Sequence, residues 1–330
     1  MNYDLSPKIL DEVKRAKRIL LNCHRSPDPD SVGSALAVRK ILLGMDKEVE
    51  VVCPDNVSGE SKFLKSSGAV KKIDYDNFDF SPFDLFIILD SAEWSQVLGF
   101  GKKKKPSVRK INIDHHFTNE KFGEINLVDE ERSSTSEILF RIFDDWGVLV
   151  DSEVAENLLT GIIYDTSCLE HSSADVETAK VFVRLMELGA DKNKIISNIF
   201  RNLNFDMVKA MTEITKNMQI DRDNRFVWSA VPFESISRYP GSFGIKSMAA
   251  GLYAASVKGA DFGMIMVEEK KDFLNVSFRA KMGFDISKIA DELGGGGHKQ
   301  AGAAVLRGIP FEKAVEKVLA VARKYAQKTS

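Results

Sequence analysis

Short apolar runs recur in the first half of the chain, and amphipathic stretches separate them. Each run has the length and the β-branched content of a strand that is buried on both faces. Between the first two runs, apolar positions from Val32 to Leu42 follow the 3.6-residue period, which predicts a helix over 31–45 that ends near Gly44. This alternation of strands and helices predicts an α/β fold with a parallel sheet. The predicted strands are 19–21, 49–52, 85–89 and 111–113.

After residue 133 the pattern becomes helical. Ser134-Thr-Ser-Glu137 is a capping box, which predicts a helix that runs to Gly147. Charges every few residues in the last two predicted helices are typical of a connector, so we place the domain boundary within 190–222. The further predicted helices are 152–164, 175–188, 191–202 and 205–218.

The remaining third of the chain mixes alternating and helical patterns, which predicts a smaller α+β domain. The domain organisation is therefore a first domain over 1–190, a helical connector over 191–222 and a second domain over 223–330. In the second domain the predicted strands are 225–233, 262–267, 273–280 and 301–306, and the predicted helices are 244–256, 285–293 and 310–327.

Composition narrows the class of protein. Hydrophobic residues make up 44% and charged residues 28% of the 330 residues, which excludes a disordered or collagen-like chain. The sequence has no run of 18 apolar residues and no signal-peptide pattern at its start, so we expect no membrane partner. Three cysteines without metal-type spacing fit a reducing cytoplasm. A net charge of −2 disfavours a protein that coats long nucleic acid.

Carboxylates and imidazoles stand where the predicted strands end. They are His24, Asp28 and Asp30 after the first strand, Asp90 after the third, and Asp114, His115 and His116 after the fourth. Ligands of open parallel sheets bind outside the carboxyl ends of the strands, so these groups are expected at one edge. Asp165 ends a predicted helix, where an acid opposes the helix dipole and favours a nearby cation.

Each of these residues alone has an ordinary structural interpretation. An Asp after a strand usually caps a helix or a turn, as Asp30 could, and His115 could be a core histidine. Crowded carboxylates repel one another without a cation, however, so their coincidence favours a metal site. Oxygen ligands with imidazoles and without thiolates suit manganese, and then cobalt, zinc or magnesium. The ligands suffice for two ions, a pair that favours in-line displacement at phosphorus.

The second domain contains a run of glycines followed by His298 and Lys299. Such a run could be a flexible loop, but exposed backbone N–H groups beside two potentially cationic side chains predict an anion-binding loop. Arg279 lies on the polar face of a predicted strand, which is usually a surface position, and beside such a loop it becomes a candidate phosphate ligand. The candidate substrate-binding residues are Arg279, Gly295, Gly296, Gly297 and His298.

The lysine run and one further histidine each have two possible interpretations. The lysine run over 102–105 is either a solvated loop or a nucleic-acid contact. His171, six residues after Asp165, is either a surface histidine or a substrate contact.

Taken together, these motifs resemble the DHH phosphoesterase superfamily. His24-Arg-Ser-Pro-Asp28-Pro-Asp30, Asp90, Asp114-His115-His116 and Asp165 are similar to its four motifs, and the glycine run with His298 and Ala301-Gly302 is similar to the motif of its DHH-associated C-terminal domain. The resemblance covers nearly the whole chain. Its size is similar to that of the stand-alone nanoRNases, 3′-phosphoadenosine 5′-phosphate (pAp) phosphatases and cyclic dinucleotide phosphodiesterases. RecJ-type exonucleases are longer, and the pyrophosphatase branch lacks this glycine motif.

The resemblance implies a role for each candidate residue. His24 and Asp28 would bind one metal ion, Asp30, His115 and Asp165 the other, and Asp90 would bridge both. His116 would lie beside the scissile phosphate, Asp114 would orient the metal-binding histidines, and Arg279, His298 and the glycine loop would hold the substrate across an interdomain cleft. The chain departs from many nanoRNases after Asp165, where Ser167-Cys-Leu-Glu170-His171 replaces an arginine and an aromatic residue.

We therefore expect a manganese-dependent phosphodiesterase that hydrolyses short nucleotides such as pApA, cyclic di-AMP or nanoRNA to 5′-mononucleotides. The alternatives are a pAp phosphatase and a nucleotide-sensing module without catalysis, although a sensor does not need two metal ions. The base preference, the choice between linear and cyclic substrates and the oligomeric state stay open, with a homodimer as one option.

Overall fold

The computed structural model describes residues 2–99, 105–242 and 244–326. The chain divides into two compact units, Met1–Asn202 and Leu203–Ser330. The division falls inside the segment where we placed the boundary. The lysine run over 102–105 lies almost entirely outside the described residues.

The first unit contains a six-stranded sheet in the order β3-β2-β1-β4-β5-β6, in which all pairs are parallel. The predicted parallel α/β fold is therefore confirmed. Two short edge strands were not predicted, because β3 is mostly exposed and β6 is only half apolar. The strands are β1 (Arg18–Asn22), β2 (Glu48–Cys53), β3 (Val70–Lys72), β4 (Leu85–Leu89), β5 (Arg109–Asp114) and β6 (Ile125–Val128).

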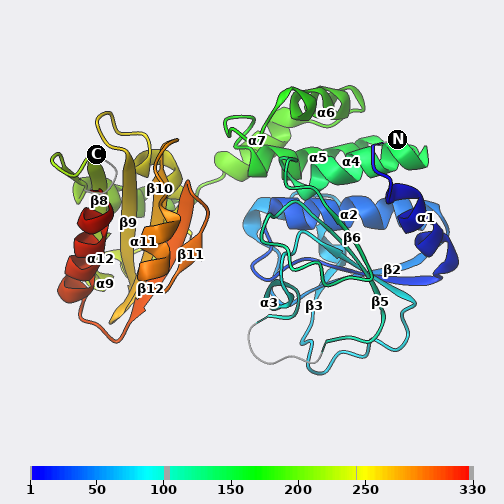
Figure 1. Ribbon diagram of the computed structural model, residues 1–330, viewed down its shortest axis with the longest axis horizontal. Coiled ribbons are helices and arrows are strands. Elements are labelled where there is room, and N and C mark those ends of the chain that lie inside the picture. The colour runs from blue at the N-terminus through cyan, green and yellow to red at the C-terminus, as the bar shows by residue number, and fades with distance from the viewer. Residues whose placement is uncertain (1, 100–104, 243, 327–330) are drawn as a thin grey trace. The chain divides into compact units, whose positions relative to one another are not determined.

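Helices α1, α2, α4 and α5 cover one face of this sheet (Figure 1). On the opposite face, Leu20, Phe86 and Ile88 pack against Tyr75 and Trp94 in a smaller core. Alternate residues of each strand thus enter different cores, as the pleat requires. The helices of the first unit are α1 (Ser6–Arg15), α2 (Pro29–Gly44), α3 (Trp94–Leu98), α4 (Thr135–Trp146), α5 (Ser152–Asp165), α6 (Val176–Glu187) and α7 (Lys192–Phe200), with 3-10 turns at Gly59–Ser61 and Ser67–Ala69.

The predicted capping box at the start of α4 forms in part. The Ser134 hydroxyl accepts a hydrogen bond from the backbone N–H of Glu137 at 3.1 Å. The Glu137 carboxylate, however, accepts from the backbone and the hydroxyl of Ser133, and from the hydroxyl of Thr178. This fully buried carboxylate therefore joins the start of α4 to α6.

Helices α2 and α5 pack closely enough to require glycines. A Cβ atom at Gly33 would overlap the backbone carbonyl of Asn157, and a Cβ atom at Gly161 would overlap the side chains of Asp30 and Ser136. The two helices therefore approach each other next to residues that the sequence singles out as metal ligands.

The second unit contains a mostly antiparallel sheet in the order β11-β12-β10-β9-β8-β7, with β8 and β9 parallel. Helices α11 and α12 cover one face and α8 to α10 the other, so the predicted α+β class is confirmed. The helix predicted over 244–256 is instead α10 followed by a π-helical turn at Ala250–Ala254. The elements are α8 (Phe205–Lys216), β7 (Gln219–Asp221), β8 (Phe226–Val231), α9 (Phe233–Ile236), α10 (Ile245–Ala249), β9 (Phe262–Lys270), β10 (Phe273–Ala280), α11 (Ser287–Glu292), β11 (Gly296–Gly297), β12 (Ala301–Arg307) and α12 (Phe311–Ala326).

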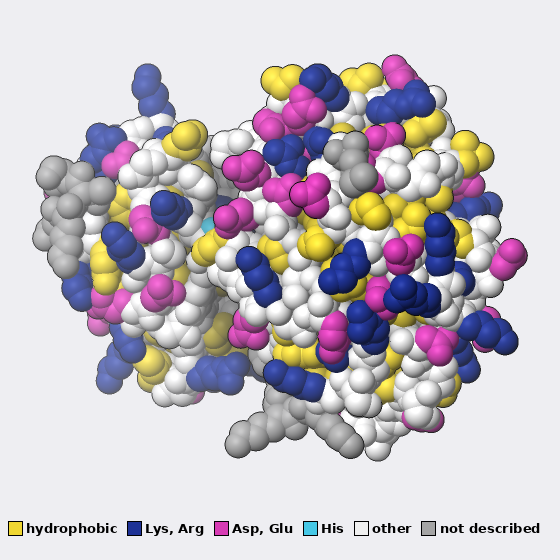
Figure 2. Space-filling view, turned by 45° about the vertical axis from the view of Figure 1, so that its right-hand side comes forward, with side chains coloured by type: hydrophobic (Ala, Val, Ile, Leu, Met, Phe, Trp, Pro, Cys, Tyr) yellow, Lys and Arg dark blue, Asp and Glu magenta, His cyan; other side chains and the backbone are white. Residues whose placement is uncertain are grey.

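Within residues 2–99, 105–242 and 244–326, no helix combines the length and the apolar character needed to cross a bilayer. Basic and acidic side chains are interspersed over the face drawn in Figure 2. That face offers mixed charge rather than a long basic track.

Candidate metal centre

Eight predicted side chains of the first unit meet in one cluster. They form three groups in which one potential ligand atom per residue lies within 4.8 Å of the others. The carboxyl ends of β1, β4 and β5 supply six of these residues, Asp30 lies in the first turn of α2, and Asp165 is the last residue of α5. The groups are His24, Asp28 and Asp90; Asp30, His115 and Asp165; and Asp90, Asp114, His115 and His116.

Asp90 stands between the first two groups. Its Oδ2 lies 3.4 Å from Nε2 of His24, and its Oδ1 lies 3.6 Å from Nε2 of His115. The Thr135 hydroxyl donates to Oδ1 at 3.1 Å. Asp90 adopts the left-handed backbone conformation with φ of 52°, a strained geometry for a residue other than glycine that clusters at functional sites. The two oxygens of one buried carboxylate are thus directed to two different histidines.

Asp30 is held by the start of α4. Its fully buried carboxylate accepts the backbone N–H groups of Thr135 at 2.8 Å and Ser136 at 3.0 Å. A helix N-terminus carries partial positive charge, so this contact stabilises the carboxylate. Asp30 does not cap its own helix, because Asp28 accepts from the backbone N–H of Ser31 at 2.9 Å.

Both histidines that face Asp90 also make a hydrogen bond to the protein backbone. Nδ1 of His24 lies 2.9 Å from the backbone carbonyl oxygen of Arg25, and His115 makes a hydrogen bond to the backbone of Arg132. Because a carbonyl oxygen can only accept, Nδ1 of His24 carries a proton, so Nε2 is the nitrogen that would offer a lone pair to a metal ion in the neutral ring.

Burial and like charge act together on the acids of this cluster. Burial, followed by repulsion from Asp90 and Asp28, raises the pKa of Asp30 to about 8. Burial and repulsion from Asp30, Asp28 and Asp90 raise the pKa of Asp165 well above its usual value. A bound divalent cation would remove this repulsion. The donor set of carboxylate oxygens and imidazole nitrogens suits manganese, magnesium or zinc, so the residues present fit the expected metal ions.

Asp114 is committed to hydrogen bonds with its neighbours. Its Oδ1 accepts from Nδ1 of His116 at 2.7 Å and from the backbone N–H of His115 at 2.8 Å, and its Oδ2 accepts from Asn119 at 2.6 Å. Burial, the largest single influence, would lower the pKa of His116, but the hydrogen bond to Asp114 and the charges of Asp90, Asp114 and Asp28 together raise this pKa to about 9. Asp114 thus forms a hydrogen bond to the imidazole ring of His116, whereas its contact with His115 is to the backbone N–H.

The segment after Asp165 departs from regular backbone geometry. Ser167, Cys168 and Leu169 all adopt left-handed conformations, with φ of 46°, 61° and 71°. His171 is exposed, and its Nδ1 lies 2.7 Å from the backbone carbonyl oxygen of Asp165. His171 thus contacts the end of α5 through the backbone of a predicted ligand, a contact that the sequence did not predict.

Comparison with protein-family models decides the assignment. The model of the DHH family N-terminal domain matches residues 18–162, and the DHHA1 domain model matches residues 241–328. The chain belongs to the DHH phosphoesterase family. The DHH match spans the first three motifs of the metal centre and ends three residues before Asp165.

Relatives match along most of this DHH-family chain. It is 27% identical to the "Bifunctional oligoribonuclease and PAP phosphatase NrnA" of Thermus thermophilus, over 96% of this chain and 93% of that protein. It is 23% identical to the "Cyclic-di-AMP phosphodiesterase PdeA" of Listeria monocytogenes, over 97% of this chain and 50% of that protein. The crystal structure of an exopolyphosphatase-related protein from Bacteroides fragilis shares the fold, with a TM-score of 0.86, 24% identity and coverage of 98% of this chain and 97% of that one.

In the DHHA1 domain, the predicted glycine loop is a tight hairpin. Gly296 and Gly297 form β11 and pair with Ala303 and Gly302 of β12. A Cβ atom at Gly295 would overlap the backbone of Ala303, and Gly297 has φ of 148°, whereas a Cβ atom at Gly296 would meet no atom closer than 4.0 Å. Gly295 and Gly297 are thus required by the fold, and Gly296 leaves an open surface.

Arg279 lies one strand away from the exposed His298. It pairs with Ala301 of β12, and Ala301 exchanges backbone hydrogen bonds with His298. The structure therefore places the predicted substrate-binding residues of this domain along one end of its sheet. The sequence did not single out Lys246. Burial, and also the positive charge of Arg279, lower the pKa of its ammonium group, so the two cations interact.

Proposed function

We propose that this DHH-family protein is a dinuclear-metal phosphodiesterase, with manganese as the preferred ion, that hydrolyses short nucleotides to 5′-mononucleotides. The observation that carries the proposal is the position of Asp90, whose two oxygens are directed to histidines of different ligand groups. A single structural ion needs no such shared carboxylate.

The cluster supplies enough ligands for each ion. His24 and Asp28 would hold one, Asp30, His115 and Asp165 the other, and Asp90 both. When bound, the two ions supply a nucleophilic hydroxide at neutral pH and neutralise charge on the phosphoryl oxygens. The hydrogen bonds that the N–H groups of α4 donate to Asp30, and the one that His24 donates to the Arg25 carbonyl, hold these ligands in position before any ion arrives.

His116 is the proposed catalytic side chain beside the ions. Asp114 engages its Nδ1, so Nε2 is the nitrogen that donates a hydrogen bond to a phosphoryl oxygen or to the leaving group. Asn119 and the His115 backbone hold Asp114 in turn, which makes Asp114 a positioning residue. In the DHHA1 domain we assign substrate binding to Arg279, His298 and the hairpin glycines Gly295, Gly296 and Gly297.

The proposed substrates are pApA, cyclic di-AMP and small oligoribonucleotides. The names of the relatives from Thermus thermophilus and Listeria monocytogenes support this class and do not choose within it. The Thermus relative also supports the alternative of a pAp phosphatase. The complete ligand set disfavours a nucleotide sensor without catalysis.

A substrate panel tests the proposal. The wild-type protein, loaded with manganese, is incubated with pApA, cyclic di-AMP, a 20-mer and pAp, and the products are separated by chromatography. We expect AMP from pApA, with kcat/KM at least about tenfold higher than for the 20-mer, equivalent to about 1.4 kcal/mol. Release of inorganic phosphate from pAp alone would favour the phosphatase, and turnover of none of the four would overturn the proposal.

Arg279→Ala separates substrate binding from the metal chemistry. We expect it to reduce kcat/KM more on pApA than on bis-p-nitrophenyl phosphate, because the artificial ester has no second phosphate for a guanidinium to bind. Equal losses on both substrates would contradict the assignment of Arg279 and leave the metal chemistry in place.

A further inference from the structure

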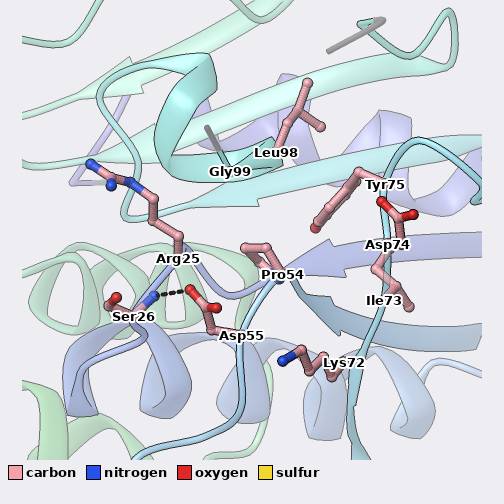
Figure 3. A pocket seen from close by; sticks show the side chains of 10 residues that line it. All are labelled: Arg25, Ser26, Pro54, Asp55, Lys72, Ile73, Asp74, Tyr75, Leu98 and Gly99. Carbon is pink, nitrogen blue, oxygen red and sulfur yellow. Dashed lines mark hydrogen bonds between the residues drawn. The ribbon is translucent and has the colours of Figure 1, made fainter. Parts of the chain in front are cut away.

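The first unit contains a pocket whose lining begins one residue after the predicted metal ligand His24. It is a pocket of about 720 Å³ whose lining residues follow β1 and β2, end or follow β3, or lie at the end of α3 (Figure 3). The lining residues that could contact a ligand through apolar surface, a cation or a hydroxyl group are Arg25, Pro54, Lys72, Ile73, Tyr75 and Leu98. None of the eight metal-centre residues lines it.

The backbone connects this pocket directly to the metal centre. Arg25 follows the predicted ligand His24, so their Cα atoms are about 3.8 Å apart. Pro54 follows Cys53, whose thiol donates to the carbonyl oxygen of His24 at 3.4 Å. The Arg25 N–H donates to the carbonyl oxygen of Gln96 at 2.7 Å, which fixes this wall of the pocket. The wall of the pocket and the metal centre therefore share a continuous stretch of backbone.

The lining combines apolar surface with opposite charges. Pro54, Ile73 and Leu98 offer apolar contact, and Arg25 and Lys72 offer positive charge. The carboxylates are partly engaged, since Asp55 accepts from the Ser26 N–H at 2.8 Å. Asp74 accepts from the Asp76 N–H at 3.1 Å and from the Asn77 amide at 2.7 Å. An inorganic anion would use the cations and leave the apolar wall uncovered, whereas a nucleoside that carries a phosphate uses both.

Tyr75 supplies an independent indication of a ligand. Its side chain is 5% exposed, and its hydroxyl oxygen has no hydrogen-bond partner in the described part of the chain. A buried hydroxyl without a partner costs about 1–3 kcal/mol. Figure 3 shows the hydroxyl end of Tyr75 directed toward Pro54 and the middle of the pocket. A ligand with a hydrogen-bond acceptor there would satisfy this group.

We propose that this pocket binds a nucleotide unit of the substrate, the unit adjoining the phosphate that is hydrolysed. The apolar wall contacts the base, Lys72 and Arg25 bind the unit's other phosphate, and the Tyr75 hydroxyl donates a hydrogen bond to the base or ribose. The assignment rests on the proposed function, and it adds a determinant that restricts the substrate to nucleotides.

Two adjacent lysines give a matched experiment. Lys72 lines the pocket, whereas Lys71 on the same strand forms an ion pair with Glu50 at 3.2 Å and does not line it. Lys72→Gln is expected to lose about tenfold more kcat/KM on pApA than on bis-p-nitrophenyl phosphate, since a charge-assisted contact is lost only with the nucleotide. Lys71→Gln is expected to change the two substrates equally. Equal effects of Lys72→Gln on both substrates would overturn the pocket assignment.

Binding measurements separate failure of the pocket from failure of the proposed function. AMP and inorganic phosphate are titrated calorimetrically into the wild type, Lys72→Gln and Tyr75→Phe in manganese buffer. We expect AMP to bind at least about tenfold more tightly than phosphate, and both variants to reduce this preference. If the wild type hydrolyses no substrate and still shows a Lys72-dependent preference for AMP, the proposed function fails and the pocket stands. An unchanged preference in both variants would refute the pocket.

Discussion

The metal centre of the DHH domain and the hairpin of the DHHA1 domain reach their chemistry in different ways. The metal centre consists of buried side chains, such as Asp30 and Asp90, whose oxygens are held by hydrogen bonds from α4. The hairpin instead contains glycines, Gly295 and Gly297, whose backbone lies so close to β12 that a Cβ atom would overlap the backbone of that strand. One site depends on which atoms the side chains present, and the other depends on side chains being absent.

This difference predicts which substitutions each site tolerates. In the metal centre, an isosteric change that removes one carboxylate charge should strongly reduce activity, because each of these charges helps to hold the proposed metal ions. In the hairpin, added volume should matter more than charge. Four substitutions test the contrast, from the largest expected effect to the smallest.

Asp90→Asn should reduce kcat by about a thousandfold, which corresponds to about 4 kcal/mol of transition-state stabilisation. The amide keeps the shape and tolerates the left-handed backbone, but it removes the charge shared by both ligand groups. Steady-state turnover in saturating manganese measures the effect, and circular dichroism checks the fold. Asp46→Asn is the matched control, because Asp46 is also left-handed, with φ of 58°, and is exposed. Near-wild-type turnover of Asp90→Asn would contradict the shared role.

His116→Ala should reduce kcat by about a hundredfold, a loss typical of a missing general acid. The protein should keep its metal, because the ring of His116 is hydrogen-bonded to Asp114 and is assigned to the phosphate. Elemental analysis after manganese loading and dialysis measures retention. His24→Ala provides the contrast and should lose metal. A His116→Ala protein that retains no manganese would make His116 a ligand instead.

Gly161→Ala should lower the free energy of unfolding by about 1–3 kcal/mol, because the added methyl group overlaps Asp30 and Ser136. The displaced Asp30 should also weaken metal binding. Denaturant unfolding measures the first effect and manganese titration the second. Gly44→Ala is the control, because its Cβ would meet no atom within 4 Å and should leave stability unchanged or slightly raised. Equal stability of both variants would mean that α2 and α5 separate without cost.

Gly296→Val should raise KM for pApA by about tenfold and leave the fold and metal content unchanged, because the side chain blocks the approach of phosphate to the backbone. A Cβ atom at Gly296 would meet no atom closer than 4.0 Å, so we expect the variant to affect binding rather than folding. Gly295→Val, whose Cβ would overlap Ala303, should unfold the hairpin instead. Unaltered kinetics of Gly296→Val would show that the hairpin is only a connection between α11 and β12.

The sequence predicted much of the DHH domain because buried parallel strands carry a strong apolar signal. The strand predicted over 85–89 has the same bounds as β4, and the ends of β1, β4 and β5 locate the acids and histidines. The strands β3 and β6 were missed because their burial is partial. The partners of Asp30 were also missed, because Thr135 and Ser136 are more than 100 residues away and only the tertiary fold brings them together.

The DHHA1 domain was harder to predict at the hairpin. Four consecutive glycines carry no apolar period, so a loop was the natural expectation, yet two of them pair with β12. The π-helical turn after α10 was missed for a similar reason, since its residues have ordinary helical patterning. Backbone hydrogen bonds define both the hairpin strand and the π-helical turn, and the pattern of apolar and polar side chains is a weak predictor of such bonds.

The close packing of α2 and α5 has a consequence for ion selectivity. Asp30 lies in the first turn of α2 and Asp165 ends α5. Gly33 and Gly161 let the two helices pack closely, and each of the two acids has an oxygen within 4.8 Å of the other. The interaxial distance therefore limits how far these two carboxylates can separate. An ion with the radius and coordination demand of calcium requires longer ligand distances than magnesium or manganese. We expect the helix pair to exclude the larger cation by size, so that calcium inhibits poorly even in excess, and substitutions that push α2 and α5 apart should relax this discrimination.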